Sequence, residues 1–333
     1  MNILVTGGSG FIGTNFIRYL LEKQNFKDTI VNYDVLTYAG NPDNLRDIQK
    51  KYSNYYFENH DICSRSKLDK VLEYYHIDTI IHFAAESHVD RSISGPSEFI
   101  NTNIIGTFTL LEAARNIKDF KRFHHVSTDE VYGSLGAKGY FYENTPYDPR
   151  SPYSASKASS DHLVRAYYHT YKLPVTVSNC SNNYGAYQYP EKLIPLIISN
   201  IVKSKELPVY GAGLNVRDWL YVEDHCSAIW SIVNNGKIGE TYNIGGECEK
   251  TNIDIVKILC KKVAELQGVD KDYTKLIKYV EDRKGHDFRY AINCDKIKDE
   301  LGWKQSVNFE EGMTKTVRWY LENQIWVDRI KGR

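Results

Sequence analysis

The chain has 333 residues, which suggests about two domains, or one large domain that carries an inserted lobe. Its 42 basic and 42 acidic residues balance, so the net charge gives no electrostatic case for binding nucleic acid or an anionic membrane surface. Six scattered cysteines lack a metal-binding spacing, and no apolar run approaches the ~18 residues of a membrane span.

The first predicted strand, residues 3–6, leads into a glycine-rich segment, residues 7–13, and then into a helical pattern. A strand this early leaves no room for a signal peptide, so we expect a cytoplasmic protein. The glycines fit both G-x-G-x-x-G and G-x-x-G-x-x-G, patterns that let a backbone turn tightly and bring helix N–H groups to a pyrophosphate. The residues expected to hold a dinucleotide here are Gly7, Gly10, Phe11, Ile12 and Gly13.

The second predicted strand, residues 29–33, ends at Asp34, which lies 21 positions after Gly13. A carboxylate there binds the hydroxyls of an adenosine ribose and repels a 2′-phosphate, which favours NAD over NADP. A third strand leads to Asp61 and Ile62, whose position suggests contact with the adenine. After a fourth strand, the small residues of segment 83–87 would let the backbone pass close to the cofactor, although plain helix packing is an alternative.

Strands alternate with helices through residue 178, which predicts an α/β fold with a parallel, doubly wound, Rossmann-like sheet. From residue 179 the alternation loosens and prolines mark a differently built lobe. Apolar residues occupy more than one face of the predicted helices 99–115 and 154–171, which favours a surface for self-association.

Two adjacent carboxylates, Asp129 and Glu130, follow the predicted strand 122–126. Carboxylates at the end of a buried strand are costly unless they face a cavity or a ligand. Ligands of open α/β sheets bind at the carboxyl ends of strands, so this is where chemistry is expected. An isolated Asp-Glu pair more often simply solvates a loop, but the glycine loop upstream and a Tyr/Lys pair downstream favour the functional interpretation.

Tyr153 and Lys157 are spaced to share one helix face, so that the ammonium can lower the pKa of the phenol. An ionised tyrosine can then take the proton of a sugar alcohol as hydride leaves its carbon. The Y-x-x-x-K pattern is weak by itself, because Tyr19 and Tyr168 match it as well. Only Tyr153 follows the end of the strand that carries the two carboxylates.

These segments together resemble the extended short-chain dehydrogenase/reductases that act on nucleotide sugars, and among them the 4,6-dehydratases. Further matching segments are 34–40, 84–92, 179–184, 216–225 and 285–291, so the resemblance covers nearly the whole chain. It implies a tightly bound NAD, dTDP-glucose as the substrate and a homodimer. It also implies a Rossmann domain over residues 1–178, with segments returning near 216–240 and 287–302, and a mostly nucleotide-sugar-binding lobe over residues 179–330.

The resemblance also implies a role for each residue of the strand end. Thr128 would hydrogen-bond the sugar O4, Tyr153 would be the base for oxidation at C4, and Lys157 would hold the nicotinamide ribose. Glu130 would remove the C5 proton, while Asp129 would protonate the departing C6 hydroxyl. The further cofactor contacts implied are Val35, Leu36, Thr37, Phe83, Ala84, Ala85, Glu86, Thr102 and Asn183. The substrate contacts implied are Ser87, Thr128, Asn182, Lys192, Leu193, Pro208, Tyr210, Arg217, Asn252, Arg283 and His286.

The chemistry is consistent without the resemblance. The C5 proton of glucose becomes acidic only when C4 is a ketone, and elimination of the C6 hydroxyl needs a nearby proton donor. A nucleotide-sugar 4-epimerase needs Tyr153 but no elimination carboxylates, so the Asp-Glu pair argues against it. Dehydratases of UDP- or GDP-sugars, and a cofactor-loaded binding protein without turnover, stay open as alternatives.

Overall fold

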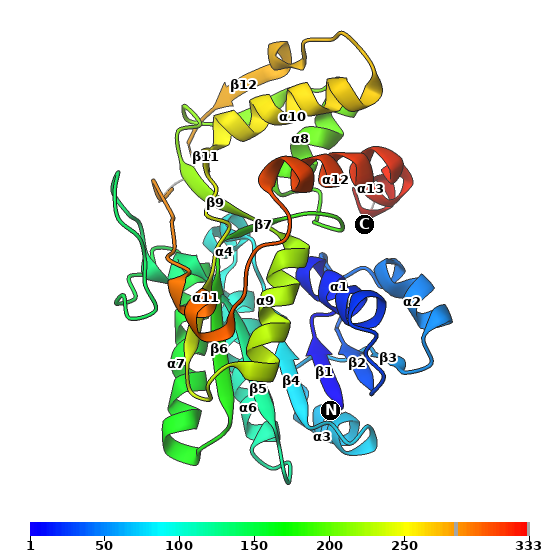
Figure 1. The fold of residues 1–333 in the computed structure, drawn as a ribbon, viewed down its shortest axis with the longest axis vertical. Coiled ribbons are helices and arrows are strands. Elements are labelled where there is room, and N and C mark those ends of the chain that lie inside the picture. The colour runs from blue at the N-terminus through cyan, green and yellow to red at the C-terminus, as the bar shows by residue number, and fades with distance from the viewer. Residues whose placement is uncertain (283–285, 332–333) are drawn as a thin grey trace.

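The computed structural model describes residues 1–282 and 286–331. Figure 1 shows a large sheet flanked by helices in the lower half of the molecule and a smaller, mostly helical lobe above it. The lobe lies over the carboxyl ends of the strands, where the chemistry is expected.

Seven parallel strands form the main sheet, in the order β10-β6-β5-β4-β1-β2-β3. Their bounds are Ile3–Thr6 (β1), Ile30–Tyr33 (β2), Tyr55–Glu58 (β3), Thr79–His82 (β4), Arg122–Thr128 (β5), Val175–Cys180 (β6) and Thr241–Ile244 (β10). The strand order reverses between β1 and β4, which opens a crevice at their carboxyl ends. The predicted Rossmann-like α/β fold is therefore confirmed.

Helices cover both faces of this sheet, and further helices form most of the smaller lobe (Figure 1). The helices are α1 (Phe11–Arg18), α2 (Arg46–Lys51), α3 (Arg65–Tyr74), α4 (Val89–Ser94), α5 (Pro96–Phe99), α6 (Thr107–Ala114), α7 (Pro152–Tyr171), α8 (Leu193–Val202), α9 (Val222–Asn235), α10 (Asn252–Gln267), α11 (Asp295–Leu301), α12 (Phe309–Glu322) and α13 (Gln324–Lys331). The core on one face holds buried residues of α3, α6 and α7, and the core on the other face holds those of α1 and α9.

Several elements differ in their bounds from the sequence-based prediction, and three of these differences bear on the site. The predicted helix 99–115 is a composite, in which the π-helical segment η3 (Ile100–Gly106) joins α5 to α6. Apolar periodicity cannot show such a change, because it reports the buried face and not the hydrogen-bond register. Strand β5 extends to Thr128 and β6 extends to Cys180, so both strands reach further toward the site than predicted.

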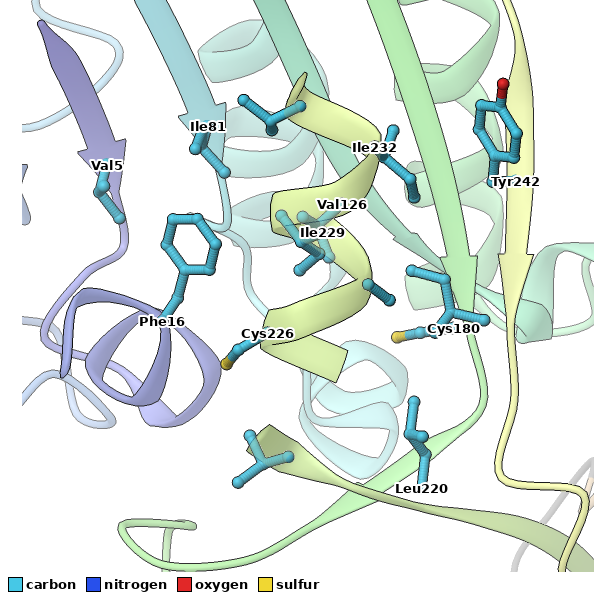
Figure 2. Close-up of a cluster of buried hydrophobic side chains, with 14 of the residues drawn as sticks. Val5, Phe16, Ile81, Val126, Cys180, Leu220, Cys226, Ile229, Ile232 and Tyr242 are labelled. Carbon is cyan, nitrogen blue, oxygen red and sulfur yellow. The ribbon is translucent and has the colours of Figure 1, made fainter. Parts of the chain in front are cut away.

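Helix α9 lies late in the chain but packs against the main sheet, in the core that also contains α1. Cys226, Ile229 and Ile232 of α9 belong to one buried cluster with Phe16 of α1 and Val126 of β5 (Figure 2). Burying an isoleucine side chain in full contributes about 1.5–3 kcal/mol, so this helix is firmly attached to the sheet. The next element, β10, pairs with β6 and extends the main sheet.

The smaller lobe has its own core. Its strands form two small sheets: β7 (Asn182–Tyr184), β9 (Val216–Tyr221) and β11 (Glu249–Thr251) in one, and β8 (Leu207–Tyr210) and β12 (Ile277–Val280) in the other. Side chains of α8, α10 and α12 pack around Trp219 in a single buried cluster. Strand β7 follows β6 almost directly, which fixes the lobe close to the end of the main sheet.

Candidate active site

A cavity of about 400 Å³ lies at the carboxyl ends of the central strands. Its walls come from the glycine loop, from the segments after β2, β4 and β5, from α7, and from the segment between β6 and α8. The predicted site residues that line it are Gly7, Gly10, Phe11, Ile12, Gly13, Asp34, Val35, Thr37, Asp61, Ile62, Phe83, Ala84, Ala85, Glu86, Ser87, Thr102, Thr128, Asp129, Glu130, Tyr153, Lys157, Asn182, Asn183 and Lys192. Residues that are far apart in the sequence thus line the same cavity.

The glycine loop forms a cradle that only glycine permits. Gly7 has a φ of +70°, and a Cβ there would lie 2.6 Å from the backbone nitrogen of Ala84. A Cβ at Gly13 would clash with the carbonyl oxygen of Gly7. The absence of these carbon atoms leaves room at the N-terminus of α1, where backbone N–H groups favour an anion. The loop therefore fits the pyrophosphate of a dinucleotide.

Asp34 is held in place by backbone donors at the end of β2. The N–H groups of Ser9 and Leu36 donate to its two carboxylate oxygens over 2.9 and 2.8 Å. Burial raises the pKa of Asp34, and these two donors oppose that shift. The carboxylate lines the cavity with acceptor capacity left for a ribose hydroxyl, so the site fits an unphosphorylated adenosine ribose.

Tyr153 and Lys157 lie on the first two turns of α7 and face the end of β5. The Lys157 Nζ donates to the carbonyl oxygen of Val126 over 2.9 Å, and its side chain is buried. Burial raises the pKa of Tyr153 well above its ordinary value, Glu130 raises it further, and a hydrogen bond with Thr128 opposes the shift. The phenol is therefore protonated in this state, whereas the sequence suggested a lowered pKa. Removal of the phenol from water disfavours its ionised form, and spacing along the sequence does not report this burial.

The two carboxylates differ in their surroundings. Asp129 is 2% exposed, and burial raises the pKa of its carboxyl well above the usual range, with the charges of Glu130 and Asp218 adding to the shift. Thr128 donates to one Asp129 oxygen over 3.4 Å, and the other oxygen has no hydrogen-bond partner among the described residues. Glu130 lies beside it, half-buried, on the cavity wall. Burial and the neighbouring negative charges thus favour the protonated form of Asp129, next to a second carboxyl group.

The remaining predicted residues lie elsewhere. Leu36 and Leu193 do not line the cavity, and Arg283 lies outside the described residues. The other predicted substrate contacts, Pro208, Tyr210, Arg217, Asn252 and His286, belong to the lobe. Tyr210 and His286 have ring centroids 6.4 Å apart, and the guanidinium of Arg217 lies 4.3 Å from the ring centroid of Tyr290. A nucleotide role for this group stays a prediction.

One cluster at the cavity was not predicted from the sequence. The guanidinium of Arg91 lies 3.6 Å from the ring centroid of Tyr38 and 3.4 Å from a carboxylate oxygen of Glu191. Tyr38 also packs edge-on against Tyr189, so three separate segments meet over the cleft. Tyr38 lies within a segment that matches the family, but with 26 tyrosines in the chain its identity carries little signal.

Comparison with known proteins gives consistent matches. The family profile of the GDP-mannose 4,6 dehydratases matches residues 4–316. A dTDP-glucose 4,6-dehydratase of Shigella flexneri is 54% identical over 348 residues, which cover 99% of this chain and 96% of that protein. The NAD-bound structure of DesIV, a dTDP-glucose 4,6-dehydratase of Streptomyces venezuelae, has a TM-score of 0.93 at 46% identity and covers 99% of this chain and 100% of its own. A dTDP-glucose 4,6-dehydratase of Bacillus anthracis in complex with NAD has a TM-score of 0.89 at 50% identity, with 99% of each chain covered.

Proposed function

The chain belongs to the nucleotide-sugar 4,6-dehydratases of the extended short-chain dehydrogenase/reductases, and on that premise we propose that it converts dTDP-glucose to dTDP-4-keto-6-deoxyglucose and water. The observation that carries this proposal is the pair of carboxyl groups at the end of β5. Asp129 is buried with its pKa raised, and Glu130 lies beside it on the wall that Tyr153 and Lys157 also line. An epimerase has no use for such a pair, so elimination is favoured over epimerisation.

The side chains at the end of β5 and on α7 each perform one step of the proposed reaction. Thr128 and Tyr153 hold the sugar O4, and the Tyr153 oxygen takes the O4 proton during oxidation. The C4 ketone acidifies the C5 proton, which the Glu130 carboxylate removes, and the protonated Asp129 gives its proton to the leaving C6 hydroxyl. Bound NAD would supply the acceptor and later the donor of the hydride, together with a positive ring charge that lowers the pKa of Tyr153. The glycine loop and Asp34 would hold its pyrophosphate and ribose.

The function is tested by the mass of the product. Protein incubated with dTDP-, UDP- and GDP-glucose in separate reactions should remove one water from the dTDP-sugar much faster than from the others. A product of unchanged mass with inverted C4 would instead identify a 4-epimerase. Fastest water loss from a UDP- or GDP-sugar would keep the reaction but overturn the proposed nucleotide.

The cofactor prediction follows from Asp34. Because its carboxylate stands where a 2′-phosphate would lie, protein purified without added nucleotide should carry NAD. Net redox is zero over the cycle, so the cofactor should stay bound through turnover. Denaturing the protein and separating the released nucleotides checks this, and recovery of NADP would contradict the ribose argument.

We also propose a homodimer formed through η3, α6 and α7. Ile105 on η3 is 46% exposed and Phe108 on α6 is 44% exposed, so two large apolar side chains lie at the surface here. Ile105→Asp should convert the dimer to a monomer, because a charge in an apolar interface is costly. Ile325→Asp is the matched control, since Ile325 is 71% exposed on α13, far along the chain. Light scattering measures the mass, and a wild-type monomer at micromolar concentration would overturn the proposal.

Among the described residues, no helix is long and apolar enough to cross a membrane. The cytoplasmic location stays a prediction, which cell fractionation would test. We also propose that the product serves deoxysugar biosynthesis, which the fate of the product in the cell would test.

A further inference from the structure

A buried carboxylate, Asp161, lies behind the active site between α7 and β5. It follows Lys157 by one helical turn and is fully inaccessible to solvent. Ser127 and Tyr147 donate hydrogen bonds to its Oδ2 over 2.9 and 2.8 Å, and the Nε2 atom of His125 lies 3.2 Å from its Oδ1. Asp161 itself does not line the cavity, whereas Lys157 does.

The surroundings of Asp161 keep it ionised. Burial raises the pKa of this carboxyl, but the polar contact with His125, the charge of Lys157 and the hydrogen bond from Ser127 outweigh burial, so its pKa lies below the usual value. Burial lowers the pKa of His125 to about 4, so this imidazole is neutral at pH 7. A buried ionised carboxylate is costly unless a cation offsets it, and the ammonium one turn away is such a cation.

The charge of Asp161 also affects the pKa of Lys157, which lines the cavity. Burial lowers the pKa of this lysine, and the charge of Asp161 is the first of the effects that oppose the shift. The only hydrogen bond from Nζ to a described residue that the geometry shows is to the neutral carbonyl of Val126, which does not fix the charge state. The first of the charges that favour the ammonium form of this buried lysine thus belongs to a carboxylate that does not line the cavity.

We propose that Asp161 is a positioning residue for oxidation at C4: its carboxylate keeps Lys157 charged, so that Lys157 can stabilise the ionised phenol of Tyr153. The proposal deepens the function proposed above and rests on it. The groups whose charges interact with Asp161 or Lys157 are His82, His125, Tyr132, Tyr147 and Cys180, and those that act on Tyr153 are Asp129, Glu130 and Cys180. Arg165 acts on His125, Tyr132 and Tyr147. Asp161 acts through Lys157, because the acidic side chains that act directly on Tyr153 are Glu130 and Asp129.

The test is Asp161→Asn, which keeps an acceptor oxygen for Ser127 and Tyr147 but removes the charge. The rate of C4 oxidation in a single turnover, followed by the absorbance of reduced nicotinamide, should fall about tenfold at neutral pH. Without the carboxylate the ammonium is less stable and the phenol ionises at higher pH. The acid limb of the pH–rate profile should therefore move up by about one unit, and the loss should shrink as the pH rises.

Tyr147→Phe is the matched control, because it removes a hydrogen bond to the same carboxylate and leaves the charge unchanged. It should lower the thermal midpoint without moving the pH profile. A purely structural Asp161 would predict equal losses at every pH for Asp161→Asn, and that result would overturn the proposal, as would an unchanged rate.

A second variant guards against a failure to fold. In Lys157→Met the ammonium is already absent, so adding Asp161→Asn should restore stability, because both buried charges are then removed together. If Asp161→Asn alone does not fold, a folded Lys157→Met/Asp161→Asn protein supports the charge pairing, and an unfolded one contradicts it. Water loss from dTDP-glucose by the wild type is measured alongside, and its failure would count against the proposed function alone.

Discussion

Glu130→Gln should stop the reaction after oxidation at C4. Tyr153 and Lys157 remain, so the ketone can form, but the C5 proton has lost its base and elimination should slow by about 10²–10⁴-fold. Substrate mixed with this variant should therefore build up the absorbance of reduced nicotinamide while it releases little dehydrated product. Solvent deuterium should fail to enter C5 at the wild-type rate.

Asp129→Asn is the matched comparison, because it changes the neighbouring carboxyl and keeps the base. Exchange of the C5 proton with solvent should continue, while loss of the C6 hydroxyl lacks its acid. The raised pKa of Asp129 makes this assignment specific, since a protonated carboxyl donates and does not abstract a proton. Adjacent carboxyls couple, so each substitution also shifts the pKa of the other group. Normal C5 exchange in Glu130→Gln together with blocked exchange in Asp129→Asn would reverse the two roles.

Tyr153→Phe should block the reaction one step earlier. The O4 proton then has no base to take it, because the hydroxyl of Thr128 is too weak a base, so C4 oxidation should slow by about 10²–10⁴-fold. Neither reduced nicotinamide nor C5 exchange should appear, because the ketone that acidifies C5 never forms.

Tyr168→Phe is its control, since Tyr168 also lies on α7 and is followed four residues later by Lys172. Tyr168 does not line the cavity, so this variant should oxidise C4 at close to the wild-type rate. Equal losses in the two variants would indicate that α7 had been disturbed and would remove the support for Tyr153 as the base.

The residues of the candidate site that the sequence could locate belong to contiguous segments. The glycine loop, Asp34 and the Tyr153–Lys157 pair each depend on local spacing at a strand or helix end, and the structure brings them to one cavity. The carboxylates at Asp129 and Glu130 were located from the end of a strand, although the strand itself runs two residues further than predicted.

What could not be predicted depends on contacts between distant segments. Arg91 meets Tyr38 and Glu191 only after three parts of the chain have folded together. Asp161 looks in the sequence like any polar residue of an amphipathic helix, and only its burial against Ser127 and His125 reveals an ionised group behind the site. The raised pKa of Tyr153 is likewise a consequence of burial, which spacing alone does not report.

The path of one hydrogen atom tests the central claim most directly. The proposed cycle moves hydride from C4 to C6 of the same sugar, so dTDP-glucose carrying deuterium at C4 should yield 4-keto-6-deoxy product with that deuterium at C6. In deuterated water, unlabelled substrate should acquire one deuterium at C5. Mass spectrometry and NMR of the product locate both labels. Deuterium retained at C4 of an epimerised sugar, or lost to solvent or to free nucleotide, would contradict the account.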